Sequence, residues 1–588
     1  MVWQKTTQRN ASSGVRRELR SKVFWYLCFI FVLLVVVRLF YIQVINHGFY
    51  KSLASGQHEM FKELVPERGS IYIQDLKDNK LIPVAVNQQL AFVYADPRNI
   101  KDADYTASKL GDVLELSVPE VENLAQRFSD HEDPYEPVKK QVDDETLEKI
   151  LALELPGIWY VREPSRYYPE QEIGGHVIGF MGANEQGYVS GKYGIEGYMN
   201  ELLAGTPGSI SSEKDIAGRI IAIGQRSIEP AVNGVDIVLT IDKTIQYVAC
   251  SKLHEAVLTH QADGGSVVIL EPNTGKVLAM CGEPDFNPNR YGEVESINAF
   301  NNPAIFAAYE PGSIFKTMTI SAGIDSGAIS PATTYEDTGS VTIGKYTINN
   351  SDELAHGIKT MTQALEESLN TGMIFAMRET TPRKFSNYIK DFGFGQKTGI
   401  MLETESQGNI SSLEEASEIY AATASFGQGI TVTPLQIANA YSAIANGGVL
   451  KKPYIIDEIR YPDGKIEKTS PTDIKRVIDS KTSNLVSAML VSVIEHGHGK
   501  RAGVDGYYIG GKTGTAQVAK TDGLGYDENI TIGSFAGFGP VEDPKFVMVV
   551  RIDRPRTVQW AESTAAPLFG EIAKFLLQYF EVAPTRNQ

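Results

Sequence analysis

The sequence predicts an α+β protein in which an antiparallel sheet packs against a helical subdomain, preceded by an elongated mixed α/β pedestal and one N-terminal transmembrane helix. Two observations lead to this fold class. β-rich runs occur between about residues 235 and 280 and return after residue 505, whereas residues 313–450 are largely helical. Strands at both ends with helices between them suggest one sheet built from distant parts of the chain. The 588 residues exceed what one hydrophobic core usually organises, so we expect at least two domains.

The composition is that of a folded protein with an uneven charge distribution. Hydrophobic residues make up 42% and charged residues 22% of the chain, which is typical of globular sequences. The net charge of −17 argues against nucleic acid as the main partner. The first 22 residues nevertheless carry six basic residues and one acidic residue, which leaves −22 for the remainder. They form a basic tail that differs from the rest of the chain.

A membrane-spanning segment follows this tail at residues 23–45. The run VFWYLCFIFVLLVVVRLFYIQVI is long enough to cross a hydrocarbon core of ~30 Å as a helix, and Arg38 is its only charge. A cleaved signal peptide would need a shorter apolar core and a small-residue cleavage site, which the following residues do not offer convincingly. The basic residues predict a cytoplasmic tail at 1–22 and everything after the helix outside the cell. We therefore expect a single-pass protein of the cell membrane.

The residue composition and the predicted secondary structure change near residue 230. Residues 46–230 are mixed and polar, with a charge-dense helical stretch at 143–157 and a Gly-rich end. They show no catalytic constellation, so we interpret them as a pedestal that supports or docks another domain. Residues 231–588 hold the β-rich runs, a helical segment at 243–258 and a closing helix at 563–580. They are the predicted second domain.

The cysteines and histidines give little sign of bound metal. Cys28 lies in the apolar run, while Cys250 and Cys281 could pair in an oxidising compartment. Two lone cysteines at this separation are more often buried packing residues, and the sequence leaves open whether these two pair. His496 and His498 stand in a Gly-rich loop without further ligands. We predict no metal and no cofactor.

The stretch AYEPGSIFKTMT, residues 308–319, places Ser313 and Lys316 three apart, directly after Pro311 and Gly312. A Pro-Gly pair before an apolar run often marks a loop that enters a helix, and positions i and i+3 of a helix share a face. A hydroxyl beside an amine at the positive end of a helix dipole is a candidate activated nucleophile. Taken alone, the pattern also fits a surface serine and a solvated lysine in an ordinary first turn.

Two further motifs decide between these interpretations. Ser368, Leu369 and Asn370 interrupt a helical pattern with hydrogen-bonding residues, and Lys512–Thr515 lies on a predicted strand. Singly, the first could be a helix cap and the second an edge strand that ends in a turn. In the order Ser-x-x-Lys, Ser-x-Asn and Lys-Thr-Gly, the three form the signature of penicillin-binding proteins and serine β-lactamases.

A competing motif overlaps the third. GYYIGGKT at 506–513 matches the phosphate-binding loop pattern G-x-x-x-x-G-K-[ST]. That loop must open a helix whose N-terminus holds phosphate. Here Gly514 follows at once and no helical periodicity comes after it, so we interpret the match as accidental.

The resemblance extends over nearly the whole chain, the membrane anchor included. YEPGSIFK at 309–316 and GQGITVTPLQIANAYSAIANGG at 427–448 resemble the class B, division-type (FtsI-like) penicillin-binding proteins. In the pedestal, PERGSIY at 66–72 and RYYPEQEIGGHVIGFMG at 166–182 resemble the same family. The chain departs from the family at 73–80, where IQDLKDNK replaces the usual Asp-Arg-Asn-Gly.

The resemblance implies a penicillin-binding or serine β-lactamase-like fold and a serine acyl-enzyme mechanism. Ser313 would attack the carbonyl between two D-alanines of a peptidoglycan stem peptide, and Lys316, if neutral, could take its proton. Ser368 would relay a proton to the leaving amine, and Asn370 would hold Lys316 and the substrate amide. An amine of a neighbouring stem peptide would then take the acyl group. Which group is the acylation base stays open.

The resemblance also implies how the substrate is bound. Lys512 would add positive charge, and the hydroxyls of Thr513 and Thr515, on either side of Gly514, would hold the terminal carboxylate. Backbone N–H groups of Ser313 and Thr515 would form an oxyanion hole.

The implied ligands are peptidoglycan stem peptides and β-lactam antibiotics, and the implied partners are a membrane glycan polymerase of the SEDS family and other division proteins. Residues 231–588 would be the transpeptidase domain, on a pedestal of the dimerisation type. Three alternatives stay open: an elongation-type class B transpeptidase, a β-lactamase, and a non-enzymatic β-lactam-binding scaffold or sensor. A β-lactamase would need efficient deacylation, and a sensor would be expected to have a larger cytoplasmic module than 22 residues.

Overall fold

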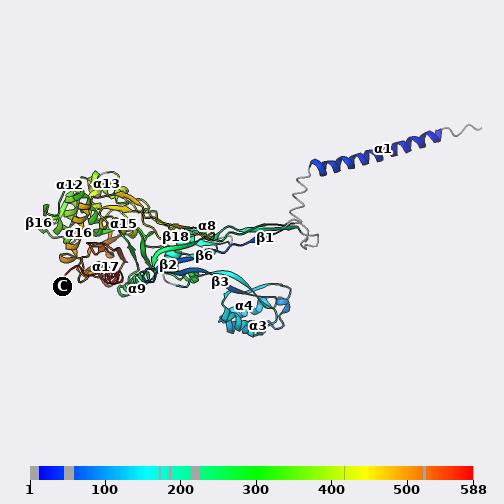
Figure 1. Ribbon diagram of the computed structural model, residues 1–588, viewed down its shortest axis with the longest axis horizontal. Coiled ribbons are helices and arrows are strands. Elements are labelled where there is room, and N and C mark those ends of the chain that lie inside the picture. The colour runs from blue at the N-terminus through cyan, green and yellow to red at the C-terminus, as the bar shows by residue number, and fades with distance from the viewer. Residues whose placement is uncertain are drawn as a thin grey trace, which may run out of the picture. The chain divides into compact units, whose positions relative to one another are not determined.

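The computed structural model describes residues 12–45, 59–170, 174–183, 188–213, 226–415, 417–520 and 525–586 (Figure 1). The first eleven residues of the predicted basic tail lie outside this set. The chain divides into two compact units, which are Met1–Pro66 with Thr206–Val232, and Glu67–Gly205 with Asn233–Gln588.

The first unit contains the apolar helix and a small antiparallel sheet. α1 (Ser12–Phe40) continues into a π-helical turn, η1 (Tyr41–Ile45), so the predicted span at 23–45 is helical throughout. Among the described residues, Lys22–Phe40 is the one helical stretch long and apolar enough to cross a membrane. The sheet has the order β1-β8-β9 and comprises β1 (Glu59–Leu64), β8 (Gly208–Glu213) and β9 (Arg226–Glu229).

The second unit begins with a mixed sheet in the order β19-β18-β10-β2-β3-β4, with β5 paired to β3. β2 and β10 run parallel, and the other pairs are antiparallel. Helices α3, α4 and α5 enclose a separate small core against β3 and β4. α5 (Asp144–Ala152) confirms the first part of the helical stretch predicted at 143–157, whereas residues 153–157 form a turn. The bounds are β2 (Ile71–Asp75), β3 (Lys80–Ala95), α3 (Ala103–Leu114), α4 (Val118–Phe128), β4 (Glu136–Val142), α5 (Asp144–Ala152), β5 (Ile158–Tyr167), β10 (Asp236–Asp242), β18 (Ile456–Arg460) and β19 (Ile466–Lys468).

A buried ion cluster joins three segments of the pedestal. Glu196, in the short helix α7 (Gly194–Tyr198), is fully buried. Its carboxylate accepts hydrogen bonds from Arg68 Nε at 2.8 Å and from Arg166 Nε at 2.6 Å. Two guanidinium groups on one carboxylate offset the cost of removing its charge from water. Removing one partner would leave a buried charge unpaired, so this cluster holds β5 to the segment before β2. Nearby short elements are α6 (Gly175–Ile178), β6 (Phe180–Ala183), β7 (Val189–Lys192) and α8 (Asn200–Ala204).

The central sheet of the second unit confirms the prediction of one sheet built from distant segments. Its antiparallel order is β12-β11-β23-β22-β21. Alternate residues face opposite sides: Val267 packs with α9 and α17, whereas Val268 packs with the core of the helical subdomain. The bounds are α9 (Lys243–His260), β11 (Gly264–Leu270), β12 (Val277–Glu283), β21 (Gly510–Ala519), β22 (Tyr526–Gly539), β23 (Phe546–Asp553) and α17 (Ala565–Tyr579).

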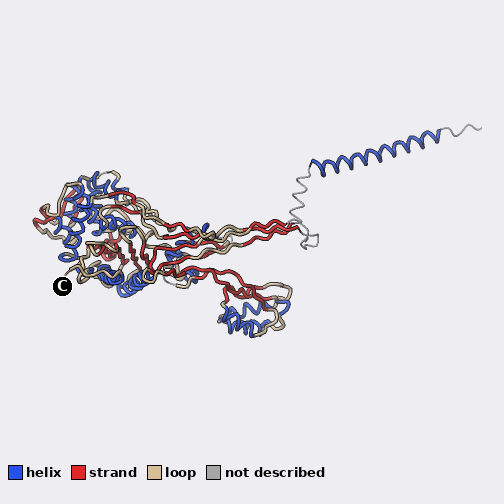
Figure 2. Tube along the Cα trace, viewed as in Figure 1, coloured by secondary structure: helices blue, strands red, loops and turns tan. Residues whose placement is uncertain are grey.

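The helical subdomain covers the other face of this sheet through α15, which contacts β11, β22 and β23. Its helices are joined by short strands and loops (Figure 2). The bounds are α10 (Lys316–Asp325), β13 (Thr334–Asp337), β14 (Ser340–Ile343), β15 (Tyr346–Asn349), β16 (Gly357–Thr360), α11 (Met361–Glu366), α12 (Asn370–Thr380), α13 (Pro382–Asp391), α14 (Glu418–Ser425), α15 (Pro434–Ala445), β17 (Val449–Lys451), β20 (Asp473–Arg476) and α16 (Ser480–His496).

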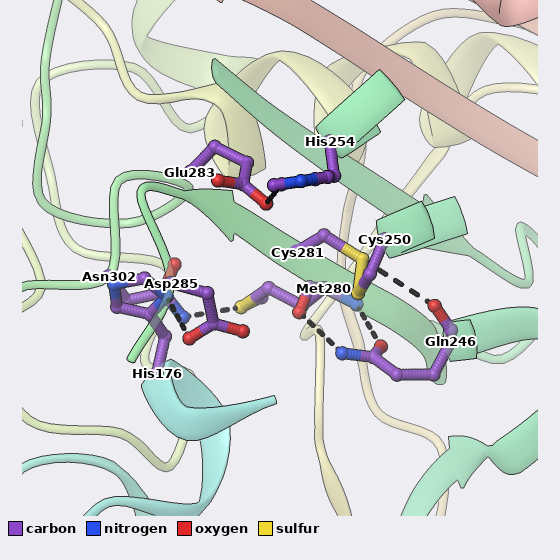
Figure 3. Close-up of a disulfide and its surroundings, with 9 residues drawn as sticks. All are labelled: His176, Gln246, Cys250, His254, Met280, Cys281, Glu283, Asp285 and Asn302. Carbon is purple, nitrogen blue, oxygen red and sulfur yellow. Dashed lines mark hydrogen bonds and ion pairs between the residues drawn. A yellow bond between two sulfur atoms is a disulfide. The ribbon is translucent and has the colours of Figure 1, made fainter. Parts of the chain in front are cut away.

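A disulfide between Cys250 and Cys281 joins α9 to β12, which answers the question that the sequence left open. Their Cα atoms lie 5.3 Å apart and their sulfurs are bonded. The neighbouring Gln246 explains how the two cysteines come together (Figure 3). Its Nε2 donates to Met280 O at 2.9 Å, and its Oε1 accepts from Met280 N at 2.8 Å. The side-chain amide thus pairs with the edge strand β12 as another strand would. It sets α9 in register, which places Cys250, one turn later, opposite Cys281.

Replacing Cys250→Ser and Cys281→Ser together is expected to lower the free energy of unfolding by about 3 kcal/mol, because the bond removes conformational entropy from the unfolded chain. The measurement is urea unfolding of the full chain in detergent. Cys28→Ser, in the apolar helix, is the control and should leave the unfolding midpoint unchanged. A double variant as stable as the wild type would contradict the stabilising role of the bond.

Candidate active site

The first motif forms a tight turn that opens a helix, as predicted. Residues Gly312–Phe315 make one 3₁₀ turn (η5), and Lys316 begins α10. Ser313 is half-buried in the turn, whereas Lys316 is fully buried. The turn rests on Gly427, where a Cβ atom would lie 2.1 Å from Gly312 O, so no larger residue fits at that position.

The Lys316 amine is held by the second motif. Its Nζ donates to the backbone carbonyl of Ser368 and to Ser368 Oγ at 3.2 Å. Burial, and then the positive charge of Lys512, lowers the pKa of Lys316 well below its ordinary value. Both effects favour the neutral form of the amine, whose lone pair can accept a proton.

Ser368 occupies a sparsely populated backbone conformation. It lies between α11 and α12, where the predicted interruption of the helical pattern is confirmed, and its φ is 57°. A non-glycine residue in this region is strained and persists only where its surroundings hold it. Asn370 begins α12, and its Nδ2 donates to Asn349 O at 2.9 Å, while the hydrogen bonds of Lys316 Nζ go to Ser368.

The third motif supplies a second buried lysine. Lys512 lies on β21, the edge strand of the central sheet, and its Nζ contacts Thr513 O at 3.1 Å and Thr513 Oγ1 at 3.3 Å. Burial lowers the pKa of Lys512 to about 7, although the charge of Glu562 acts in the opposite direction. The strand continues to Ala519, so the phosphate-binding loop interpretation is wrong, as expected.

Gly514 brings this strand against the first motif. A Cβ atom at Gly514 would lie 2.8 Å from Pro311 O and 2.9 Å from Ser534 Oγ. Thr513 and Thr515 point to the opposite face of the strand from Gly514. Thr515 Oγ1 accepts from Ala561 N at 3.1 Å. The glycine is needed because backbone meets backbone at this point.

Glu310 is a site residue whose contacts the sequence did not reveal. Its Oε1 accepts from Gly429 N at 3.0 Å, and Tyr526 OH donates to its Oε2 at 3.0 Å. Burial raises the pKa of Glu310, against these hydrogen bonds. The carboxyl group therefore connects the turn before Ser313 to the start of β22. The signal was present in the Glu-Pro-Gly triplet, but its partners are more than a hundred residues away.

No candidate metal centre accompanies these residues in the described part of the chain, where no three His, Cys, Asp or Glu side chains converge. His498 instead lies 3.4 Å from Glu562. The site thus combines the half-buried Ser313 hydroxyl with two buried lysines, Lys316 and Lys512, whose pKa values are both lowered. This combination suits nucleophilic acyl transfer on a substrate that carries a carboxylate.

Comparison with known proteins supports this chemistry. The family described as "Penicillin binding protein transpeptidase domain" matches residues 265–574, and "Penicillin-binding Protein dimerisation domain" matches residues 63–239. Stage V sporulation protein D of Bacillus subtilis (strain 168) is 34% identical over 97% of this chain and 87% of that protein. Peptidoglycan D,D-transpeptidase FtsI of Escherichia coli (strain K12) is 30% identical over 85% of this chain and 82% of that protein. The structure of penicillin binding protein 3 from Mycobacterium tuberculosis complexed with aztreonam gives a TM-score of 0.68 at 27% identity, covering 89% of this chain and 98% of that one.

Gly514→Ala is expected to slow covalent labelling by a fluorescent penicillin at least about tenfold, because the added methyl group pushes β21 away from Pro311. Labelling rate and thermal unfolding are measured together on the purified full chain. Gly292→Ala is the matched control, since a Cβ atom there meets nothing within 4 Å. Equal labelling rates for the two variants would show that the close approach is not required.

Proposed function

This chain belongs to the class B penicillin-binding proteins, which are serine-type peptidoglycan D,D-transpeptidases, and on that premise we propose that it cross-links stem peptides during septal wall synthesis with Ser313 as the nucleophile. The observation that carries the assignment is the buried Lys316, which begins the helix directly after the Ser313 turn, is bound to Ser368 and has a pKa lowered well below its ordinary value by burial.

In the acylation step, Ser313 Oγ attacks the carbonyl carbon between two D-alanines. The Oγ–C bond forms while the hydroxyl proton passes to Lys316 Nζ. When the tetrahedral intermediate collapses, the C–N bond to the terminal D-alanine breaks. Lys316 returns the proton through Ser368 Oγ, 3.2 Å away, to the leaving amine.

In the second step, an amine of a neighbouring stem peptide attacks the Ser313 ester. The new C–N bond forms, the Oγ–C bond breaks, and the amine's proton returns to Ser313 by the same path. No external oxidant, reductant or cofactor is needed. The product is a cross-link between two stem peptides, and the enzyme returns to its starting state.

Substrate recognition is assigned to β21. Lys512 provides positive charge, and the hydroxyls of Thr513 and Thr515 hold the terminal carboxylate. Because β21 is the edge strand of its sheet, its outer backbone groups are available to an extended peptide. The N–H groups of Ser313 and Thr515 stabilise the oxyanion of the intermediate.

The location in the cell is inferred from α1 and from the basic residues at positions 1–22. The helix anchors the protein in the cell membrane with its catalytic domain outside the cytoplasm. We assign residues 1–22 to the cytoplasm, 23–45 to the span, 46–230 to the pedestal and 231–588 to the transpeptidase domain. The anchor and pedestal are the surfaces through which a glycan polymerase of the SEDS family and other division proteins would be bound.

Ser313→Ala is expected to reduce covalent labelling by a fluorescent penicillin by at least about a thousandfold, because the acyl-accepting oxygen is lost. The thermal unfolding midpoint should stay within about 2 °C. Ser326→Ala, at the end of the same helix, is the control and should label as the wild type does. Persistent labelling of the Ser313 variant would assign the nucleophile to another serine, and rapid turnover of nitrocefin by the wild type would favour a β-lactamase.

Depletion of the protein is expected to give filaments that fail to septate, with a fluorescent fusion concentrated at mid-cell. The division role rests on the resemblance of the Glu310–Gly312 triplet and of residues 427–448 to the division type. Round or swollen cells would instead indicate the elongation type. Normal growth with defective spores would indicate a role like that of the sporulation relative. The catalytic assignments are the same in all three cases.

A further inference from the structure

Two short two-stranded sheets pack against the beginning of α12, outside the three motifs. β13 pairs with β16 and β14 pairs with β15, so that residues 334–360 fold as one unit between α10 and α11. Asp337, the last residue of β13, is only 1% exposed. None of the steps proposed above uses this carboxylate, although burying an ionised group is costly unless it is fully hydrogen-bonded.

Asp337 receives donors from four residues. Thr371 Oγ1 donates at 2.6 Å, Asn350 Nδ2 at 3.0 Å, His356 N at 2.8 Å and Gly339 N at 3.2 Å. Burial on its own would raise the pKa of Asp337, but these hydrogen bonds outweigh it and lower the pKa below its ordinary value. The group therefore stays ionised and forms charge-assisted hydrogen bonds.

Two of these contacts lead directly to the second motif. Thr371 is the second residue of α12, and its backbone N donates to Asn350 Oδ1 at 3.2 Å. This N–H is one of the first four in the helix, which have no partner within it. Asn370 Nδ2 donates to the backbone O of Asn349, the last residue of β15. The first turn of α12 is thus held by side-chain and backbone contacts to residues 337–350.

The strained Ser368 needs such support on both sides. On the α11 side, Leu369 N donates to Ala364 O at 2.9 Å. On the α12 side, Thr371 donates to Asp337 and to Asn350, which holds the first turn of the helix. A shift there would move the Ser368 carbonyl and hydroxyl away from Lys316 Nζ.

We propose that Asp337 is a positioning residue for acylation, which acts through Thr371 and Asn350 to hold the first turn of α12 so that Ser368 meets the Lys316 amine. The inference rests on the proposed roles of Ser313, Lys316 and Ser368. Asp337 is a buried anion that contributes to acylation without contacting the substrate. Its contribution is to the rate of the covalent step, and not to the affinity for the substrate carboxylate, which is assigned to β21.

The test compares Thr371→Val with Thr371→Ser. Valine keeps the shape of threonine but removes the hydroxyl that donates to Asp337, whereas serine keeps that hydroxyl. Stopped-flow measurements of penicillin acylation separate the acylation rate constant from the dissociation constant of the preceding complex. We expect at least a tenfold lower rate constant for Thr371→Val, a dissociation constant within twofold of wild type, and a rate for Thr371→Ser within threefold of wild type.

Asp337→Asn provides a second variant in case Thr371→Val does not fold, because it keeps the size of the side chain and replaces one acceptor oxygen with a donor. It is expected to lower the acylation rate constant in the same way. Tyr335→Phe removes another contact of the Thr371 hydroxyl, the 3.2 Å contact with Tyr335 OH, and should acylate normally.

A wild-type acylation rate in Thr371→Val would overturn the inference, as would equal losses in the Val and Ser variants or a loss confined to the dissociation constant. If Ser313→Ala abolishes labelling while Thr371→Val has no effect, only this positioning role fails. If Ser313→Ala still labels, the proposed nucleophile fails instead.

Discussion

The contact between the Lys316 amine and Ser368 is the interaction on which the rest of the active site depends. Burying an ammonium group away from water costs on the order of several kcal/mol, so burial lowers the pKa of Lys316 well below its ordinary value. Its N–H groups still need acceptors, and Ser368 supplies both a carbonyl and a hydroxyl oxygen. The charge of Lys512 acts in the same direction as burial. Desolvation and a neighbouring positive charge therefore both favour the neutral, basic form of the Lys316 amine.

This arrangement restricts the residues that surround it. Three segments must approach the Ser313 turn closely enough to exclude water, and two of them do so through glycine. Gly427 lies against the backbone of Gly312, and Gly514 lies against Pro311. A side chain at Gly514 would push β21 away from the turn, and a side chain at Gly427 would push the segment after α14 away from Gly312. The close packing that buries Lys316 is therefore the reason for the small residues beside it.

The parts of the chain farther from the chemistry are stabilised by more ordinary means. The pedestal segments are joined by Arg68 and Arg166 on the buried Glu196. The central sheet is tied to α9 by the disulfide and by Gln246, which pairs with the edge of β12. These contacts keep the sheet in place without entering the active site. Ser368 is one of the non-glycine residues with positive φ, and its backbone conformation is linked to the position of the base.

The sequence by itself determined the apolar N-terminal helix, the alternation of β-rich and helical regions and the three motifs, because these patterns are expressed in neighbouring residues or in short fixed spacings. It also predicted that Lys512 lies on a strand. Only the tertiary structure decided that Cys250 pairs with Cys281, since a sequence separation of 31 residues leaves their distance open until α9 packs on β12. The same holds for Asp337, whose partner on α12, Thr371, is 34 residues away. Burial arises from packing between distant segments, so the depressed pKa of a lysine cannot be derived from its neighbours in sequence.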